Sequence, residues 1–425
     1  MAKTINSHFI ILCFTLLILN FINSSFASSN PEISYISHHH HHKNKDKIGV
    51  YELKKKNISV KLTNFGASLI SVFLPDKHGK VDDVVLGYNH AKEYVWWVKA
   101  SAKLIMAADD YPTFFNCEEI KVTATLKPHQ IDGVSWLIHR YLLGFNVILV
   151  ANLVVLGGDG FGLAVVDLVV LGGDDDGDRD GGPKGFSNVL WKVDEYQPEG
   201  VSPFVTFSYF SPDGEEGFPG DLKVTVTYRI IEGKHLIVFM QAKPLNKPTP
   251  VNLAQHTYWN LGGQNSGTIF EHEVQIFASH ITPVDDELIP TGKLEKVEGT
   301  PFDFRKPHTI GSRIKEVPKG FDINYALDIH KTRGPIKPVA IVSEKKSGRV
   351  MELFANQPGV QFYTGNMLNK TIGKEGSVYG RYGGLCLETQ GFPDAVNHPN
   401  FPSMMVAPGE TYQHYMFYKF STKKR

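Results

Sequence analysis

One histidine and one glutamate, far apart along the chain, have neighbours that suit acid–base chemistry. His256 lies in the stretch Asn252–Leu261, among β-forming residues and beside Tyr258 and Trp259. We expect this stretch to form a strand, and an imidazole titrates near neutral pH, so it can donate or accept a proton. Glu388 follows a short apolar run and precedes a Gly-Phe-Pro turn, near the expected end of a strand, where functional residues are often found.

Each candidate residue also has an ordinary structural interpretation. A lone histidine on a strand is more often a hydrogen-bonded structural residue, and an isolated glutamate is usually at the surface. Asp322 alone fits a turn, and Gln361 alone fits the edge of a sheet. Tyr258 can stack on a ligand ring, although core packing is the commoner fate of such aromatic residues. Residue types alone therefore do not decide whether these residues have a structural or a catalytic role.

A set of motifs in a fixed order changes that balance. The stretch around His256 resembles the acid-histidine motif of the aldose 1-epimerases (galactose mutarotases). The other motifs of this resemblance are Asn64-Phe-Gly-Ala67, Thr300-Pro-Phe-Asp-Phe304, Gly320-Phe-Asp322, Gln357-Pro-Gly-Val-Gln-Phe-Tyr-Thr-Gly-Asn366 and Leu387-Glu-Thr-Gln-Gly-Phe-Pro-Asp-Ala-Val396. The resemblance covers residues 48–97 and 181–422.

The resemblance implies a role for each residue. Glu388 is the general base and His256 the general acid, while Asp322 holds sugar hydroxyls and Gln361 lies near the anomeric end. The base removes the proton of the anomeric hydroxyl while the acid protonates the ring oxygen, each step contributing roughly 10²–10⁴-fold. The ring opens to the aldehyde, rotates, and closes on the other face. This chemistry requires no metal or other cofactor, and we expect the two groups to meet across a pyranose-sized hollow.

The strand pattern predicts an all-β fold. Short apolar runs at 50–53, 58–62, 69–74 and 83–86 alternate with turn residues at hairpin distances. With 425 residues, 42% of them hydrophobic, the chain is long enough for a large core. We expect a large antiparallel β-sandwich spanning residues 48–422, and the resemblance implies the supersandwich of the galactose mutarotases.

Residues 98–180 depart from this pattern, and we expect an atypical, partly helical or disordered insert there. Residues 126–143 have helical periodicity and resemble the start of a chromatin-remodelling helicase ATPase core. No Gly-Lys-Ser/Thr follows, so the segment lacks the means to bind a triphosphate. The acidic run 174–180 fits a solvated loop better than a calcium site. Our hypothesis is that 98–180 is a foreign or mis-spliced segment.

Two departures from the family pattern affect the proposed site. The family's Gly-Arg-Val-Ala-Asn-Arg-Ile segment has no counterpart, and Asp180 stands where the family has a second histidine. An ionised aspartate cannot donate a hydrogen bond and repels the charge of the base. We therefore expect weakened or absent turnover. The alternatives are a non-catalytic, carbohydrate-binding homologue and a defective chimera that does not fold.

The N-terminal residues predict secretion. An apolar run at 9–22 follows Lys3 and precedes the small residues of Ser25-Phe-Ala27, which is typical of a signal peptide spanning 1–27. A membrane anchor is the alternative, but the run is short for a span of ~20 residues. Residues 28–47 are a polar linker, and its tract His38–His42 lacks the defined geometry of a metal site.

Other features limit the partners. Asn57 and Asn369 begin sequons that secretion would make usable for glycosylation. Lys plus Arg and Asp plus Glu number 44 each, so the net charge gives no reason to expect nucleic acid or an anionic membrane as a partner. The expected partner is a small-molecule sugar, a free aldohexose.

Overall fold

The computed structural model describes residues 47–94, 185–285, 288–328 and 335–423, and the backbone of three short strands at 147–150, 153–156 and 169–170. The expected signal peptide, nearly all of the His-rich linker, the helix expected at 126–143 and Asp180 lie outside the described residues.

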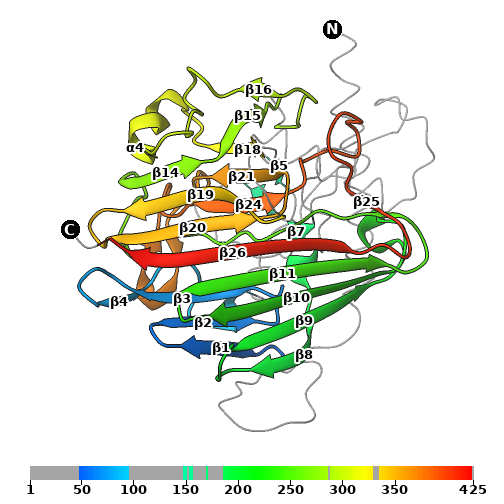
Figure 1. Ribbon diagram of the computed structural model, residues 1–425, viewed down its shortest axis with the longest axis horizontal. Helices are drawn as coiled ribbons and strands as arrows, with labels where there is room; N and C mark the ends of the chain where they lie inside the picture. The colour runs from blue at the N-terminus through cyan, green and yellow to red at the C-terminus, as the bar shows by residue number, and fades with distance from the viewer. Residues whose placement is uncertain are drawn as a thin grey trace, which may run out of the picture.

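Antiparallel strands make up nearly all of the described regular structure, which confirms the all-β prediction (Figure 1). The nine-stranded sheet has the order β17 (His308–Thr309), β14 (His272–Ile276), β19 (Lys337–Glu344), β20 (Arg349–Ala355), β26 (Tyr412–Thr422), β11 (His235–Pro244), β10 (Leu222–Ile231), β9 (Phe204–Ser211) and β8 (Lys192–Gln197). A five-stranded sheet has the order β16 (Glu295–Lys296), β15 (Ala278–Thr282), β18 (Asp322–Leu327), β21 (Gly359–Tyr363) and β24 (Cys386–Gln390). A four-stranded sheet contains β1 (Val50–Lys55), β2 (Ile58–Thr63), β3 (Leu69–Pro75) and β4 (Val81–Asp83) in sequence order.

Short elements complete the described structure. The two-stranded pairs are β12 (Thr249–Pro250) with β25 (Met405–Val406), β13 (Leu253–Ala254) with β7 (Val169–Val170), β22 (Thr371–Ile372) with β23 (Val378–Tyr379), and β5 (Val147–Val150) with β6 (Leu153–Leu156). Helical turns are α4 (Ile310–Arg313), η1 (Phe186–Asn188), η2 (Glu215–Gly217), η3 (Ile314–Glu316) and η5 (Lys374–Gly376), and residues 91–94 are also helical. Within the part of the chain that the structure describes, no helix is long and apolar enough to span a membrane.

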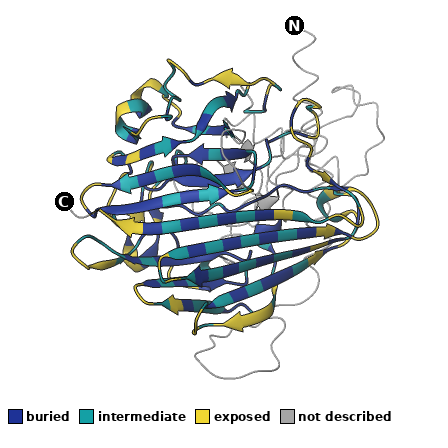
Figure 2. Ribbon diagram, viewed as in Figure 1, coloured by how far each residue is buried: buried dark blue, intermediate teal, exposed yellow. Residues whose placement is uncertain are grey.

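The strands follow from alternating apolar and polar residues. In β10, Leu222, Val224 and Val226 are buried while Lys223 is exposed, as the two-residue period of a strand requires. Figure 2 shows this alternation of buried and more exposed positions along the long strands of the nine-stranded sheet. The side chains on the inner face therefore build the core.

The largest buried cluster of the described residues joins the layers. It includes residues from Leu53 in β1 to Phe420 in β26, and Trp259 and Phe362 are among its largest fully buried members. Burying one such side chain contributes roughly 1.5–3 kcal/mol. The inner strands of the sandwich are thus held rigidly, and they carry the residues described next.

Part of the unusual segment joins this framework. Backbone pairing connects Val170 of β7 with Leu253 of β13, just before His256. The described part of 98–180 therefore consists of strands, and one of them lies beside the chain that leads to the candidate site.

Candidate active site

Three neighbouring strands bring the predicted site residues to one face of the five-stranded sheet. Gln361 of β21 is paired with Glu388 of β24, and Tyr363 of β21 lies between Asp322 and Cys386 in the next row. Residues two positions apart on a strand share a face, so both rows point to the same side. Sequence reasoning placed Glu388 near a strand end, but it lies in the middle of β24, whose residues are all buried.

His256 comes to this face from a separate element. It follows β13 in an irregular segment, so the strand expected for this stretch is wrong at His256 itself. The backbone N–H of Trp259 donates to the Leu385 carbonyl at 2.7 Å, and the Leu385 N–H donates back at 2.9 Å. These two bonds hold the histidine segment beside the start of β24.

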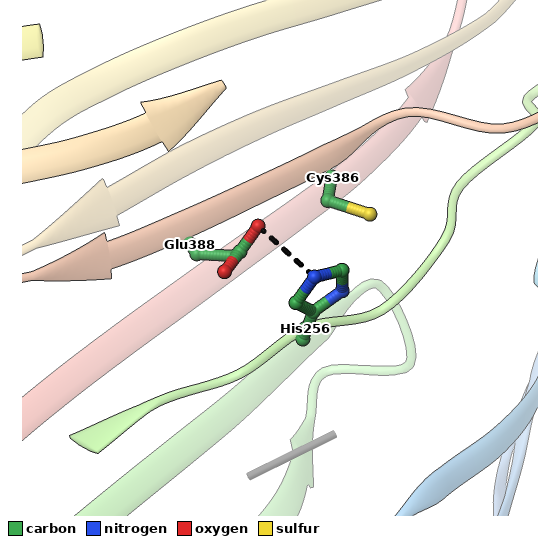
Figure 3. Close-up of side chains that lie close together, drawn as sticks. All are labelled: His256, Cys386 and Glu388. Carbon is green, nitrogen blue, oxygen red and sulfur yellow. Dashed lines mark ion pairs between the residues drawn. The ribbon is translucent and has the colours of Figure 1, made fainter. Parts of the chain in front are cut away.

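The candidate acid and base face each other directly. Nε2 of His256 lies 3.5 Å from Oε1 of Glu388. Figure 3 shows the two side chains pointing toward each other. The side chain of His256 is 21% exposed and that of Glu388 6% exposed, so the imidazole is the accessible member of the pair. No ring-sized gap separates them, in contrast to the hollow expected from the sequence.

Two opposing effects act on the imidazole. Burial lowers the pKa of His256 to about 4, because a buried cation loses its hydration. An ionised Glu388 at 3.5 Å acts in the opposite direction, since a nearby negative charge stabilises the imidazolium. Burial outweighs this attraction, so the imidazole of His256 is neutral near pH 7.

Polar groups line the sheet face beside the pair. Nε2 of Gln361 donates to Oδ1 of Asp322 at 2.7 Å, and Nε2 of Gln390 donates to Oδ1 of Asn324 at 3.3 Å. Within the described structure, Oε1 of Gln361, Oε1 of Gln390 and Nδ1 of His256 are buried without a hydrogen-bond partner. Each such atom costs about 1–3 kcal/mol, so three of them at one face indicate groups arranged to meet a polar ligand.

Two tyrosines frame the pair. The ring of Tyr258 lies 5.1 Å from that of His256, and the ring of Tyr363 lies 6.0 Å from it. Burial, followed by the nearby Tyr363, raises the pKa of Tyr258 well above its usual 10, so its hydroxyl stays neutral. Trp259 is 1% exposed and packs on Tyr418 at 5.3 Å, so it belongs to the core and not to a ligand surface.

Sequence reasoning missed several residues of this face. Tyr363, Asn324, Gln390 and Cys386 were not singled out, although each lies two positions from a predicted site residue on the same strand. The two-residue period of a strand was the signal that could have found them.

The chain is similar to known proteins over most of its length. The family model described as aldose 1-epimerase matches residues 176–419. A galactose mutarotase from Rattus norvegicus is 38% identical over 373 residues, covering 87% of this chain and 93% of that protein. One from Homo sapiens is 37% identical over 378 residues with the same coverage. An aldose 1-epimerase from Escherichia coli is 34% identical over 248 residues, covering 56% of this chain and 69% of that protein.

Solved structures share the fold. An aldose epimerase homologue from C. elegans has a TM-score of 0.64 at 24% identity, covering 89% of this chain and all of that one (100%). A galactose 1-epimerase from Lactobacillus acidophilus has a TM-score of 0.62 at 22% identity, covering 91% and 98%. The helicase-like character of residues 126–143 stays a sequence prediction that these comparisons do not support.

Proposed function

The chain belongs to the aldose 1-epimerase family, and we propose that it interconverts the α and β anomers of free hexoses such as glucose and galactose. The observation that carries this proposal is the 3.5 Å approach of His256 Nε2 to Glu388 Oε1 on a face lined with polar groups. An acid and a base in contact are the groups that ring opening needs.

The short separation suits the reaction. The hydroxyl that loses a proton and the ring oxygen that gains one are bonded to the same carbon, C1. A base and an acid that serve both oxygens must therefore lie close together, and a gap as wide as a sugar ring would separate them too far. Glu388 takes the proton of the anomeric hydroxyl while His256 protonates the ring oxygen, and closure of the rotated aldehyde reverses both transfers.

The lowered pKa of His256 affects both the strength and the supply of the acid. An imidazolium with a pKa near 4 gives up its proton readily, but few such rings carry the proton at neutral pH. The Glu388 carboxylate offsets this deficit by stabilising the imidazolium. Both groups therefore depend on each other for their reactive protonation states.

The remaining polar face binds the sugar in this proposal. Asp322 accepts hydrogen bonds from sugar hydroxyls, and the partnerless oxygens of Gln361 and Gln390 accept others. Tyr258, beside the imidazole, offers an aromatic face for the pyranose. A free aldohexose is the expected partner.

Polarimetry tests the proposal. We expect the purified chain to accelerate the decay of α-glucose rotation, and Glu388→Gln to slow it roughly 10²–10⁴-fold because the amide cannot take the proton. Glu298→Gln is the control, since that side chain is 71% exposed. If Glu388→Gln changes nothing while the chain still binds galactose, the chain is a non-catalytic sugar-binding homologue.

We expect the rate to lie below that of typical family members. The family's Asn-Arg segment has no counterpart here, and Asp180 replaces its second histidine. Support for this part comes from the sequence alone. A rate equal to that of the rat galactose mutarotase under the same conditions would contradict it.

We further propose that residues 98–180 are a foreign or mis-spliced segment within the epimerase framework, partly resembling a helicase core. Sequencing the transcript across both junctions tests this. A cooperative melt of the purified chain would exclude the alternative that it does not fold, because a defective chimera gives no such transition.

We also propose that the protein is secreted. The N-terminal run supports cleavage after Ala27, and Asn57 supports glycosylation because it lies exposed in the turn between β1 and β2. Expression of the full chain in secreting eukaryotic cells, followed by N-terminal sequencing of the protein in the medium, tests the cleavage. An uncleaved, cell-bound product would favour the membrane anchor.

A further inference from the structure

The acid–base pair has a third neighbour with no role in proton transfer. The imidazole of His256, the thiol of Cys386 and the carboxylate of Glu388 place one ligand atom each within 4.8 Å of one another. Cys386 and Glu388 share a face of β24, and His256 approaches them from the opposing segment (Figure 3). Nitrogen, sulfur and oxygen donors thus converge from two elements.

We propose that His256, Cys386 and Glu388 form a binding site for Zn²⁺ or a similar borderline-soft divalent cation, and that the bound ion inhibits the enzyme. The inhibition rests on the proposed mutarotase function, whereas the binding rests on the geometry alone.

The spacing of the donors fits a tetrahedral ion. With Zn–N and Zn–O bonds near 2.1 Å, two ligands of a tetrahedron lie about 3.4 Å apart. The observed separation between His256 Nε2 and Glu388 Oε1 is 3.5 Å, so this edge is already formed. The sulfur edges of a zinc site are about 3.6 Å. The thiol of Cys386 lies within 4.8 Å of both other donors, so a small movement of this side chain completes the site.

The donor set selects the ion. A thiolate and an imidazole favour zinc and related transition metals, while magnesium and calcium prefer oxygen ligands. Three protein ligands leave a fourth position for water, and the partly exposed ring of His256 gives the ion access.

The bound ion would block catalysis. It occupies the Nε2 lone pair of His256 and the carboxylate of Glu388, so neither group can exchange a proton with the sugar. The thiol of Cys386 loses its proton to solvent as the metal–sulfur bond forms. Zinc and sugar therefore compete for the same atoms, and a chelator restores the activity.

Cobalt binding gives a test that is independent of turnover. We would titrate the full-length chain with Co²⁺ and record the near-ultraviolet charge-transfer absorption, which requires a cobalt–thiolate bond. His38–His42 is replaced by glutamine in every protein, because that tract can itself bind metal. We expect the band in the parent chain, its loss in Cys386→Ser, and its retention in the control Cys117→Ser.

Zinc inhibition gives the second measurement. We expect Zn²⁺ to inhibit mutarotation of the parent chain and the half-inhibiting concentration to rise roughly a hundredfold in Cys386→Ser, with each protein's inhibition measured relative to its own metal-free rate. If Cys386→Ser fails to fold, the parent chain alone still tests the proposal, because saturating galactose must suppress the cobalt–thiolate band of the parent chain.

The outcomes separate the two proposals. Absence of the thiolate band in an active parent chain overturns the metal site, as does a band that Cys386→Ser leaves intact. A band that galactose does not suppress overturns the competition between ion and sugar. A cobalt–thiolate band in a chain without mutarotase activity supports the metal site and overturns the proposed function instead.

Discussion

A buried histidine on β26 ties together the two elements that carry the acid and the base. His414 is fully buried, with Nδ1 3.0 Å from the Leu253 carbonyl and Nε2 2.8 Å from Oγ1 of Thr389. A carbonyl only accepts, so Nδ1 carries the proton and Nε2 accepts from the threonine hydroxyl. Leu253 precedes His256 by three residues and Thr389 adjoins Glu388, so a neutral His414 positions both groups of the proposed acid–base pair.

This arrangement predicts how stability depends on pH. Burial lowers the pKa of His414 to about 3, against 6.5 for an ordinary imidazole. As the pH falls below 6.5, His414 takes up a proton in the unfolded chain but not in the folded chain. The contribution of the neutral imidazole to stability is therefore fully present above pH 6.5 and is lost as the pH falls toward 3. The loss is ~1.4 kcal/mol per pH unit at most, and about 1 kcal/mol between pH 6 and 5.

We expect His414→Gln to change the free energy of unfolding in two ways. At pH 7 the variant should be less stable by about 1–3 kcal/mol, because the amide cannot satisfy both Leu253 and Thr389. From pH 6 to pH 5 its stability should fall by about 1 kcal/mol less than that of the parent chain, because glutamine does not titrate. His256 and His272, whose pKa values are also lowered to about 4, titrate in both proteins, so their contributions cancel in the comparison.

Urea unfolding at pH 7, 6 and 5 measures these differences, with His78→Gln at an exposed turn as the control for losing one histidine. Polarimetry on the same samples should show kcat reduced roughly tenfold or more, because a displaced acid and base lose their alignment. Parallel losses of stability in His414→Gln and the parent chain between pH 6 and 5 would refute the assignment of a neutral, buried imidazole.

Three further substitutions test other contacts. Asp322→Asn should raise KM roughly tenfold, with a smaller effect on kcat, in steady-state polarimetry. The substitution weakens both the contact with the sugar and the 2.7 Å hydrogen bond from Gln361. An unchanged KM would show that Asp322 does not bind the sugar. Lys374→Met should lower the free energy of unfolding in urea by about 3–5 kcal/mol, since it leaves the largely buried carboxylate of Asp83 without its cation at 2.8 Å. The added change Asp83→Asn should recover part of that loss, and an unchanged stability of Lys374→Met would contradict a stabilising role of the ion pair. Asn57→Gln should remove one glycan from chain secreted by eukaryotic cells, measured as a mass shift that endoglycosidase treatment abolishes. A mass difference no larger than the one methylene group that the substitution adds would exclude glycosylation there.

The regular part of the fold was predictable because it depends on local alternation. The first three strands were expected at 50–53, 58–62 and 69–74, and β1, β2 and β3 contain all of these residues. The fourth was misplaced, since β4 ends at Asp83, where the expected run begins. The order of the sheets depends on contacts between distant segments, so a single sequence does not specify it.

The irregular segment around His256 shows where local patterns fail. Its composition favours a strand, but Gln255 and Thr257 bond to each other, with a 2.5 Å contact from the Gln255 amide to Thr257 Oγ1. Such local bonds compete with a strand ladder. The bridge between Trp259 and Leu385 then sets where His256 lies, and that contact spans a distance along the chain that no periodicity reveals.

The site residues themselves came from the ordered motifs, and the chemistry of the anomeric carbon explains their spacing. Two oxygens on one tetrahedral carbon require a base and an acid in close contact, which places His256 Nε2 3.5 Å from Glu388 Oε1. Two ligands of a tetrahedral zinc ion require nearly the same separation. A pair arranged for ring opening therefore provides two of the three ligands of the proposed metal site. The thiol of Cys386, two residues from Glu388 on the same face of β24, provides the third. Susceptibility to zinc thus follows from the reaction itself once a third donor lies on that face, and replacing Cys386 should weaken zinc inhibition while His256 and Glu388 stay in place.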